Sequence, residues 1–358
     1  MTWKIWTFTT MNTSMRRFRG TWSAVKLATG TKRFFAYRDA CLVRGVCGRV
    51  RLLRVMSVLP MCARLLTKDF DQCDRADIER LLAALLAHKP AYTPQTLGTY
   101  KAILRRFFSW LKKPETFPSK ELPPIVNWFS SYVPRRAKRL LDREELVTPA
   151  EIDLVLAQCD HPRDKALINL LWEAGARISE IGNLRVRQVS KVEHGYTLSL
   201  HGKTGQRTPL IIASAPKLTV WLRHHPFANN PDAPLWVYHR YLKQPKHTRY
   251  EALRMLLKRQ FNRAGITKRI YPHLFRHSRS TYCVATGMLT DAQAKKYFGW
   301  TPDSDMLRHY THLIDEDANN ALLQHHGIQA AQTPRGPEVR SCLVCKELNQ
   351  ANAVLHEM

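Results

Sequence analysis

Two arginines and a histidine stand at positions suited to holding a phosphate group. Arg177 follows a leucine-rich stretch that ends at Gly175, and His273 precedes Arg276 by three residues. On a helix, a spacing of three places His273 and Arg276 on the same face. A guanidinium donates a fork of N–H groups that matches two phosphate oxygens, which a lysine cannot do. These side chains are therefore candidates for stabilising the charge on the non-bridging oxygens of a phosphodiester.

Three further side chains provide the remaining parts of a transesterification. Lys203 stands in the sequence GKTG, which is typical of a hairpin tip, and its ammonium group can reach a groove or a leaving oxygen. Trp300 offers an indole N–H donor or a wall for packing. Tyr310 carries a phenol that can attack phosphorus and hold the phosphate covalently. Together these residues predict strand transfer that needs no metal or nucleotide cofactor.

Taken singly, each of these residues has an ordinary alternative. An arginine in a helix is usually a surface residue, and a tyrosine usually belongs to a core or its rim. The GKTG segment is usually only a turn, and it lacks the G-x-x-x-x-G-K-[ST] spacing of a phosphate-binding P-loop. The hypothesis therefore depends on the order of the residues and on the elements that carry them.

The chain is strongly basic. Its 358 residues include 56 Lys and Arg against 29 Asp and Glu, which gives a formal net charge of +27. A positive field of this size favours a polyanion, and nucleic acid is the usual one. No stretch approaches the roughly 18 consecutive apolar residues of a membrane-spanning helix, and the N-terminus lacks the pattern of a secretory signal. We therefore expect a cytoplasmic protein without a membrane partner.

A small helical DNA-binding domain is predicted for residues 37–135. The segment DRADIERLLAALLAHKP has apolar residues on one helical face, and Thr93 followed by Pro94 predicts the start of the next helix. Its predicted buried stripe is Leu97, Tyr100, Leu104, Phe107 and Leu111. Lys101 and Arg105 lie off this stripe and are candidates for DNA contact.

A proline-rich and then basic segment follows this domain. The run RRAKR adds four candidate DNA contacts, Arg135, Arg136, Lys138 and Arg139. A strap along a phosphate backbone and a solvated linker both fit this composition. We assign residues 136–147 to a basic linker. Residues 1–36 are assigned to a basic N-terminal arm, which either contacts DNA or has no fixed structure.

Residues 148–328 are predicted to form a mainly α domain with a small antiparallel β-sheet. Thr148-Pro-Ala-Glu151 is a capping box, and Thr248 to Glu251 predicts another. The segments YTLSL and TPLII flank GKTG as the strands of a hairpin. HLFRHSRSTYCVAT and the segment that ends at YFGW are predicted helices, and a further helix around Asp305 to Thr311 carries the tyrosine.

Taken in order, GARISEIGNL, GKTG, HLFRHSRST, YFGW and HYTHL closely resemble the motifs of the tyrosine recombinase (phage integrase) family. The resemblance covers residues 148–328 and extends more loosely over 38–135. It assigns the family's catalytic set to Arg177, Lys203, His273, Arg276, Trp300 and Tyr310. Glu180, three residues after the first arginine, corresponds to an orienting group behind it. The details of YFGW and HGI resemble archaeal integrases in particular.

The resemblance implies a helical core-binding domain on one face of double-stranded DNA and a mixed α/β catalytic domain on the other. Four protomers would assemble on two DNA sites and exchange strands through a 3′-phosphotyrosyl intermediate, without ATP. Lys203 would be the general acid, with His273 and Trp300 helping to orient the phosphate. Trp300 stands where the family more commonly has histidine. Such an enzyme integrates or excises a mobile element or provirus.

Four alternatives stay open. A Xer-type chromosome-dimer resolvase would use the same chemistry, and a type IB topoisomerase would relax DNA without choosing a site. A DNA-binding protein that has lost cleavage would tolerate Tyr310→Phe. A basic RNA-binding protein gives no reason for HLFRH and HYTHL to stand where they do.

Residues 329–358 form a tail that resembles part of a zinc ribbon. Cys342, Cys345 and His356 would provide three ligands, whereas structural zinc sites use four. A degenerate ribbon without a metal is the favoured interpretation, and two incidental thiols are the alternative. The other six cysteines are scattered without a disulfide pattern, which agrees with an intracellular protein.

Overall fold

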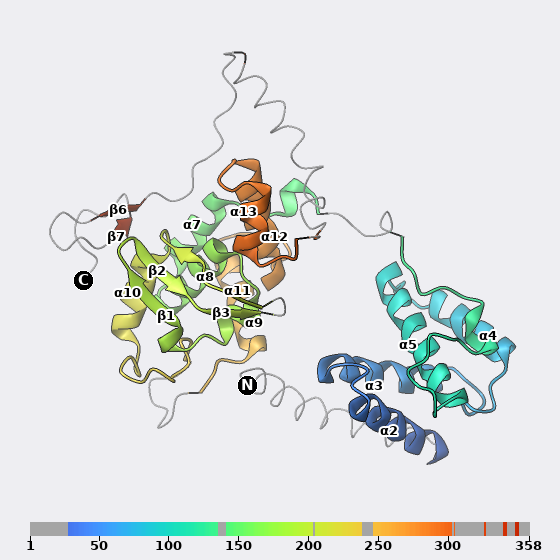
Figure 1. The fold of residues 1–358 in the computed structure, drawn as a ribbon. Coiled ribbons are helices and arrows are strands. Elements are labelled where there is room, and N and C mark those ends of the chain that lie inside the picture. The colour runs from blue at the N-terminus through green and yellow to red at the C-terminus, as the bar shows by residue number, and fades with distance from the viewer. Residues whose placement is uncertain are drawn as a thin grey trace. The chain divides into compact units, whose positions relative to one another are not determined.

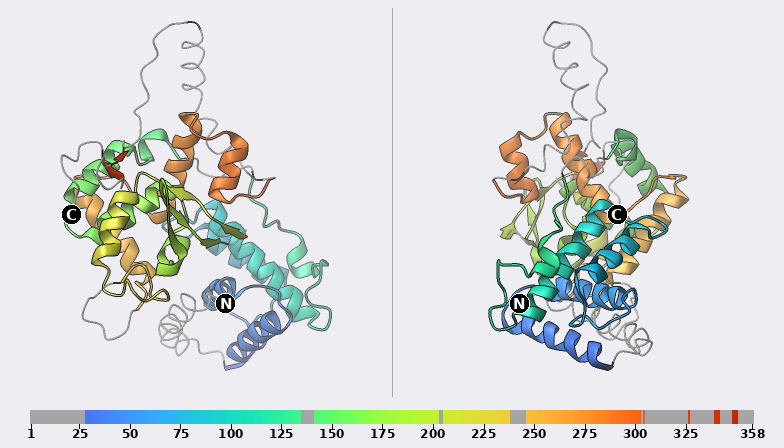
Figure 2. Two further views of the ribbon diagram at one scale, coloured as in Figure 1. Left: turned by 60° about the vertical axis from the view of Figure 1, so that its left-hand side comes forward. Right: turned by 90° about the vertical axis from the view of Figure 1, so that its right-hand side faces the viewer.

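The chain divides into two compact units, Met1–Arg139 and Leu140–Met358, each of which is visible in Figures 1 and 2. The structure is a computed structural model, and it describes residues 28–134, 141–202, 205–237, 246–302, 304, 326, 339–341 and 348–350. Within these ranges, no helix is both long enough and apolar enough to span a membrane.

The described part of the first unit is helical. Its helices are α2 (Ala28–Val43), α3 (Arg49–Ala63), α4 (Arg75–Leu86), α5 (Pro94–Lys112) and α6 (Pro124–Asn127). Two of the helix starts follow from local sequence. Asp74 accepts a hydrogen bond from the backbone N–H of Asp77 at the start of α4, and Thr93 accepts one from Thr96 at the start of α5. The predicted cap at Thr93 is confirmed.

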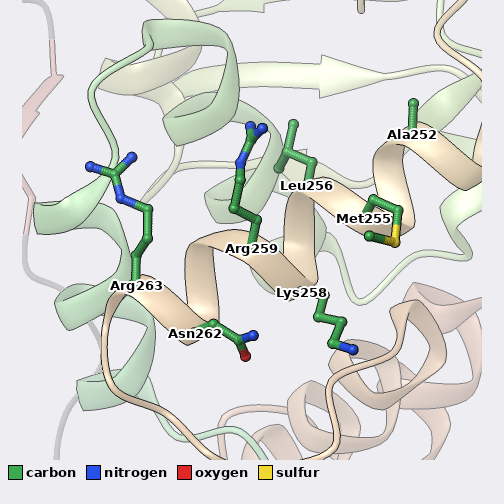
Figure 3. A pocket seen from close by; sticks show the side chains of 7 residues that line it. All are labelled: Ala252, Met255, Leu256, Lys258, Arg259, Asn262 and Arg263. Carbon is green, nitrogen blue, oxygen red and sulfur yellow. The ribbon is translucent and has the colours of Figure 1, made fainter.

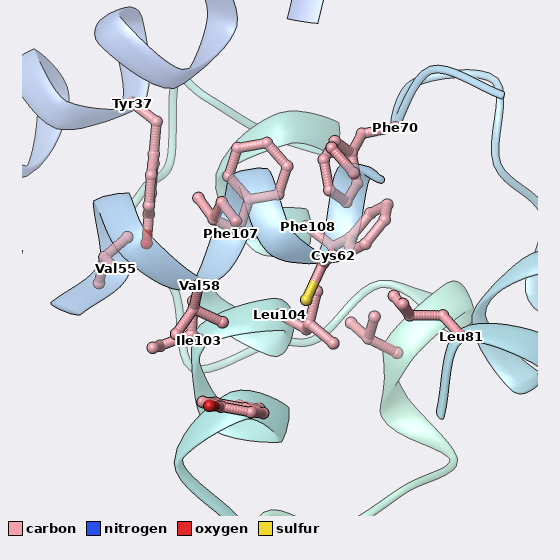
Figure 4. Close-up of a cluster of buried hydrophobic side chains, with 14 of the residues drawn as sticks. Tyr37, Val55, Val58, Cys62, Phe70, Leu81, Ile103, Leu104, Phe107 and Phe108 are labelled. Carbon is pink, nitrogen blue, oxygen red and sulfur yellow. The ribbon is translucent and has the colours of Figure 1, made fainter. Parts of the chain in front are cut away.

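Aromatic rings pack against one another in the core of the first unit (Figure 4). The ring of Phe107 on α5 lies 5.0 Å from that of Phe70 and 5.2 Å from that of Tyr37, both in edge-on geometry. The predicted stripe of α5 is confirmed, because Tyr100, Leu104 and Phe107 are buried while Leu97 and Leu111 pack against the same cluster. Lys101 and Arg105 are half-buried beside it.

The structure corrects the predicted start of the helical domain. Phe34 on α2 is buried and packs edge-on against Phe70 with 5.7 Å between ring centroids. The boundary drawn between residues 36 and 37 therefore runs through the middle of α2, which is part of the first core. The sequence of α2 mixes small, basic and aromatic residues without an apolar stripe, so its periodicity gave no signal.

The second unit is built around one buried helix, α8 (Pro162–Ala174). Every residue from Ala166 to Ala174 is buried, as expected for a helix covered on all sides. Its neighbours are α7 (Pro149–Gln158), α10 (Ala215–His224) and α12 (Pro272–Ala285). The remaining described helices are α9 (Ile178–Gly182), α11 (Tyr250–Arg263), α13 (Asp291–Phe298) and the 3-10 turns η2 (Arg143–Glu145) and η3 (Val186–Gln188).

The strands of the second unit form small antiparallel sheets. β1 (Val189–Val192), β2 (Gly195–Leu198) and β5 (Leu210–Ile211) form one sheet in the order β1-β2-β5. β3 (Leu200–Gly202) pairs with β4 (Gly205–Arg207), and β6 (Val339–Ser341) pairs with β7 (Leu348–Gln350). The predicted single hairpin is thus divided into β2–β5 and β3–β4, and β1 joins it. A mainly α fold with small antiparallel sheets is confirmed.

Two capping boxes were predicted in this unit, and one of them is wrong. Thr148 caps α7 and shares a reciprocal pair of hydrogen bonds with Glu151, as predicted. Helix α11 instead begins after Arg249. Thr248 is buried, and its hydroxyl donates to the carbonyl oxygen of Trp236 at 2.7 Å. The hydroxyl that the local pattern predicted to cap α11 is thus bonded to a backbone carbonyl twelve residues earlier in the chain.

The end of the predicted linker belongs to the second unit. Leu146 and Val147 are buried, and the backbone N–H of Val147 donates to Oγ of Ser278 on α12 at 2.8 Å. Residues 143–145 form the turn η2. Val147, at the end of this segment, is therefore attached to the helix that carries His273 and Arg276.

Candidate active site

Arg177 stands at the first turn of α9, directly after the end of α8. Gly175 ends α8 with a φ of +50°, and a Cβ at this position would lie 2.5 Å from Cε1 of Phe298, so both the turn and the packing require glycine. Nη1 of Arg177 donates to Oε1 of Glu180 at 2.7 Å. The side chain of Arg177 is 30% exposed, so its guanidinium lies at the surface of the unit.

Glu180 is a buried carboxylate held by two arginines. Oε2 accepts hydrogen bonds from the backbone N–H of Arg177 at 3.1 Å and from Nη2 of Arg207 at 2.7 Å. Burial alone would raise the pKa of Glu180, but the charge of Arg207 and the hydrogen bonds from Arg177 and Arg207 outweigh it and hold the pKa below its ordinary value. The carboxylate is therefore ionised at neutral pH and fixes the direction of Arg177.

Arg276 joins the ends of two helices. It lies on α12 and is 2% exposed, with Nη1 donating to the carbonyl oxygen of Gly175 at 3.1 Å and Nη2 to that of Phe298 at 2.6 Å. These are the C-terminal residues of α8 and α13, where carbonyl groups lack helical partners and a cation is favourable. The two bonds use two of the five N–H donors of the guanidinium.

His273 lies one turn before Arg276, and its ring meets that of His277 edge-on with 4.5 Å between centroids. Partial burial of the imidazole lowers the pKa of His273, and the positive charges of Arg276 and Arg177 lower it further. His273 is therefore neutral at neutral pH in this structure. The same interactions mean that one imidazole and two guanidinium groups lie within electrostatic reach of one another.

Occupation of this site by a phosphodiester should raise the pKa of His273, because the negative charge offsets the two guanidinium groups. In the free protein the pKa should lie below 6.5, its ordinary value. The folded state then resists protonation, so this group destabilises the fold as pH falls below that value and contributes nothing above it. NMR titration of ¹⁵N-histidine-labelled Tyr310→Phe protein, with and without DNA and with His273→Gln for assignment, measures both values. A pKa at or above 6.5 without DNA would contradict the prediction.

Trp300 packs against the arginine of α12. Gly299 ends α13 in the left-handed conformation, and Trp300 follows it half-buried. Its ring lies 5.2 Å from that of Phe298 and 5.5 Å from the guanidinium carbon of Arg276. Of the two roles considered for Trp300, these contacts match a packing wall.

The β3–β4 hairpin approaches Arg177 through a glycine. Gly202 pairs with Gly205 across the hairpin, and a Cβ at Gly202 would lie 2.4 Å from Oε1 of Glu180 and 3.5 Å from Nη1 of Arg177. Lys203, the residue after Gly202, lies outside the described residues. The strand that leads to it nevertheless passes directly over the Arg177–Glu180 pair.

Gly202→Ala should therefore displace the Glu180 carboxylate and misdirect Arg177. We expect DNA cleavage to slow by about 10- to 100-fold, the effect of a misplacement of about 1 Å in a catalytic group. Single-turnover cleavage rates measure this effect, with the melting temperature measured in parallel. Gly48→Ala is a matched control, because a Cβ there meets nothing within 4 Å. Wild-type cleavage by Gly202→Ala would show that Arg177 tolerates a shift of its partner.

The structure brings together Arg177, Glu180, His273, Arg276 and Trp300. Several predicted site residues lie outside the described part of the chain, namely Lys203, Tyr310, Arg135, Arg136, Lys138, Arg139, Cys342, Cys345 and His356. Arg207, which was not predicted from the sequence, stands four residues after Lys203 and holds the same carboxylate as Arg177.

A separate hollow of about 530 Å³ lies along α11 (Figure 3). Met255 and Leu256 provide its apolar part, and Lys258, Arg259 and Arg263 surround it. None of the candidate catalytic residues lines it. Among the described residues, no cluster of three His, Cys, Asp or Glu side chains is placed to hold a metal ion.

The chain resembles known proteins in sequence and in fold. Residues 143–317 match the phage integrase family model. Tyrosine recombinase XerC of Haemophilus ducreyi is 22% identical over 230 residues, which cover 63% of this chain and 71% of the relative. A crystal structure of XerH bound to a palindromic difH substrate superposes with a TM-score of 0.58 at 18% identity, over 76% of this chain and 80% of that one.

A λ integrase tetramer bound to a Holliday junction superposes with a TM-score of 0.57 at 12% identity, over 79% of this chain and 80% of that one. At such identities the structural likeness concerns the fold alone. The archaeal subtype is not singled out by these matches and stays a prediction. The chain belongs to the tyrosine recombinase (phage integrase) family, whose members are DNA breaking and rejoining enzymes.

Proposed function

We propose that this chain is a site-specific recombinase that integrates or excises a mobile element or provirus. The observation that carries the proposal is that Arg177, His273 and Arg276 lie together. The guanidinium of Arg177 is the partly exposed one, and Glu180 holds it from behind. Two guanidinium groups and a neutral imidazole can bind a phosphodiester and stabilise the additional charge of its transition state. The net charge of +27 supplies the attraction to DNA.

In the proposed reaction Tyr310 loses its phenolic proton to solvent, and its oxygen attacks a DNA phosphorus to form a 3′-phosphotyrosyl bond. The bond from phosphorus to the 5′ oxygen breaks, and Lys203 gives its proton to that oxygen. Arg177 and Arg276 stabilise the non-bridging oxygens, while His273 orients the phosphate. The free 5′ hydroxyl of a second strand then attacks the phosphotyrosine and gives its proton back to Lys203, while Tyr310 leaves and takes up a proton from solvent. One phosphodiester replaces another, so the exchange needs no ATP, and the arginines provide the positive charge that a metal ion would otherwise bring to the phosphate.

We further propose that four copies act on two DNA sites, as in the λ integrase tetramer bound to a Holliday junction. The first unit would contact double-stranded DNA through Lys101, Arg105 and the basic run at 135–139. Lys101 and Arg105 are half-buried, and a long basic side chain at such a position can bury its aliphatic part while its charged end stays in solvent, which agrees with this role. The enzyme would act in the cytoplasm.

Trapping of the covalent intermediate tests the proposal. The protein is incubated in EDTA with fragmented DNA of the source organism, stopped with SDS, and the attached DNA is sequenced. We expect an adduct at Tyr310 that is enriched for one sequence and absent from Tyr310→Phe. Tight DNA binding without an adduct would overturn the proposed recombinase activity and favour a cleavage-defective DNA-binding protein. Adducts at unrelated sequences would favour a topoisomerase.

The second candidate is a Xer-type chromosome-dimer resolvase. It is favoured by the sequence similarity to XerC of Haemophilus ducreyi. The same sequencing distinguishes the two functions. Enrichment of the two junctions of a mobile element supports the integrase, and enrichment of a single chromosomal locus without flanking element sequence supports the resolvase.

A further inference from the structure

Arg207 on β4 connects two parts of the candidate active site. Its Nη2 donates to Oε2 of Glu180 at 2.7 Å, and its Nη1 donates to the carbonyl oxygen of Tyr297, near the end of α13, at 2.6 Å. Its side chain is 11% exposed. Both partners are distant in sequence, and one guanidinium reaches both because its nitrogens diverge from a rigid plane.

The charges around Glu180 leave one positive charge in excess. One carboxylate stands between two guanidinium groups, with Arg177 on Oε1 and Arg207 on Oε2. If Arg177 were the only cation present, Glu180 would neutralise it, and little net charge would face a phosphate. Because Arg207 shares the carboxylate from its more buried position, the excess charge falls on the more exposed Arg177.

Arg207 also completes a chain of hydrogen bonds that spans the site. Tyr297 and Phe298 are consecutive, and their carbonyl oxygens accept hydrogen bonds from Arg207 and Arg276 respectively. Arg276 bonds in turn to Gly175, two residues before Arg177. The hairpin, the start of α9, the middle of α12 and the end of α13 are thereby tied together through three arginines and one glutamate.

We propose that Arg207 is a positioning residue for DNA cleavage, which acts through Glu180 to direct Arg177 at the phosphate. The proposal rests on the proposed function of this site. It predicts that Arg207 contributes to the cleavage step and not to DNA affinity, since the guanidinium is turned inward. It also predicts that most of its contribution depends on the carboxylate of Glu180.

A double-mutant cycle with Glu180→Gln tests this dependence. Single-turnover cleavage and DNA affinity are measured for Arg207→Ala, Glu180→Gln and the double variant on a DNA site identified by adduct sequencing. Arg207→Ala should slow cleavage by about 30- to 300-fold with DNA affinity within about threefold. In the Glu180→Gln background, Arg207→Ala should slow cleavage by less than about fivefold. If Arg207→Ala slows cleavage by the same factor with Glu180 and with Gln at position 180, the proposal is overturned.

Two further variants separate positioning from loss of folding. Arg207→Lys keeps a charge but can reach only one of the two acceptors. It should therefore recover part of the cleavage rate, whether or not Arg207→Ala unfolds. Arg263→Ala removes an exposed ion pair with Asp160, 3.0 Å long, and should leave cleavage unchanged in both backgrounds. If both Arg207 variants cleave at the wild-type rate, the positioning role of Arg207 is overturned and the proposed function is not. Absence of any Tyr310-dependent adduct in the wild type would instead overturn the proposed function.

Discussion

Tyr310→Phe should abolish covalent attachment to DNA, with strand cleavage slowed by at least about 10⁴-fold, as expected when a nucleophile is removed. The substitution deletes the hydroxyl oxygen that forms the phosphotyrosyl bond in the proposed reaction. DNA affinity should stay within about twofold, because phosphate contacts from basic residues dominate binding. Adduct formation on SDS gels and binding by gel shift measure the two quantities on the same preparation.

Tyr297 provides the matched control for this experiment. It lies beside the candidate site, where its hydroxyl donates to the backbone carbonyl of Glu173 at 3.2 Å. Burial raises the pKa of Tyr297 far above the ordinary value of a phenol, and the charge of Glu173 raises it further, so its phenolate is inaccessible at neutral pH. Tyr297→Phe should therefore keep the adduct. An adduct retained by Tyr310→Phe and lost in Tyr297→Phe would reassign the nucleophile.

Features encoded within a few residues could be predicted from the sequence. The caps at Thr93 and Thr148, the glycine end of α8 at Gly175 and the stripe of α5 all follow from local rules. The spacing from His273 to Arg276 placed both on one helix for the same reason. Each of these signals needs only the geometry of a single turn.

Features that depend on distant partners could not be predicted. Thr248 has the sequence of a helix cap, but its hydroxyl donates to the carbonyl oxygen of Trp236, twelve residues earlier in the chain. Arg207 stands in an ordinary strand sequence, and its partners are 27 and 90 residues away. Phe34 belongs to the first core although its helix has no apolar stripe. Only tertiary packing reveals these roles, because the local patterns around them are neutral or misleading.

Arg276 shows why the structural and chemical roles of such a residue have to be measured separately. Arg276→Ala leaves the carbonyl oxygens of Gly175 and Phe298 without their donors in a buried setting. Loss of these bonds should lower the free energy of unfolding by about 2–4 kcal/mol and the melting temperature by about 5–15 °C. Cleavage should fall by at least about 10³-fold, because a cation on the phosphate is also lost.

Arg276→Lys and Arg279→Ala divide this combined effect. Lysine can bond to one carbonyl and keeps the charge, so Arg276→Lys should recover stability. Cleavage should stay at least about 100-fold slower than in the wild type, because lysine lacks the paired N–H donors of the guanidinium. Arg279, also buried on α12, donates to the carbonyl of Glu173 at 3.2 Å, so Arg279→Ala should lose stability without a comparable loss of cleavage at temperatures where it is folded. If cleavage instead follows the melting temperature across all three variants, Arg276 acts by holding the helix ends and not by binding phosphate.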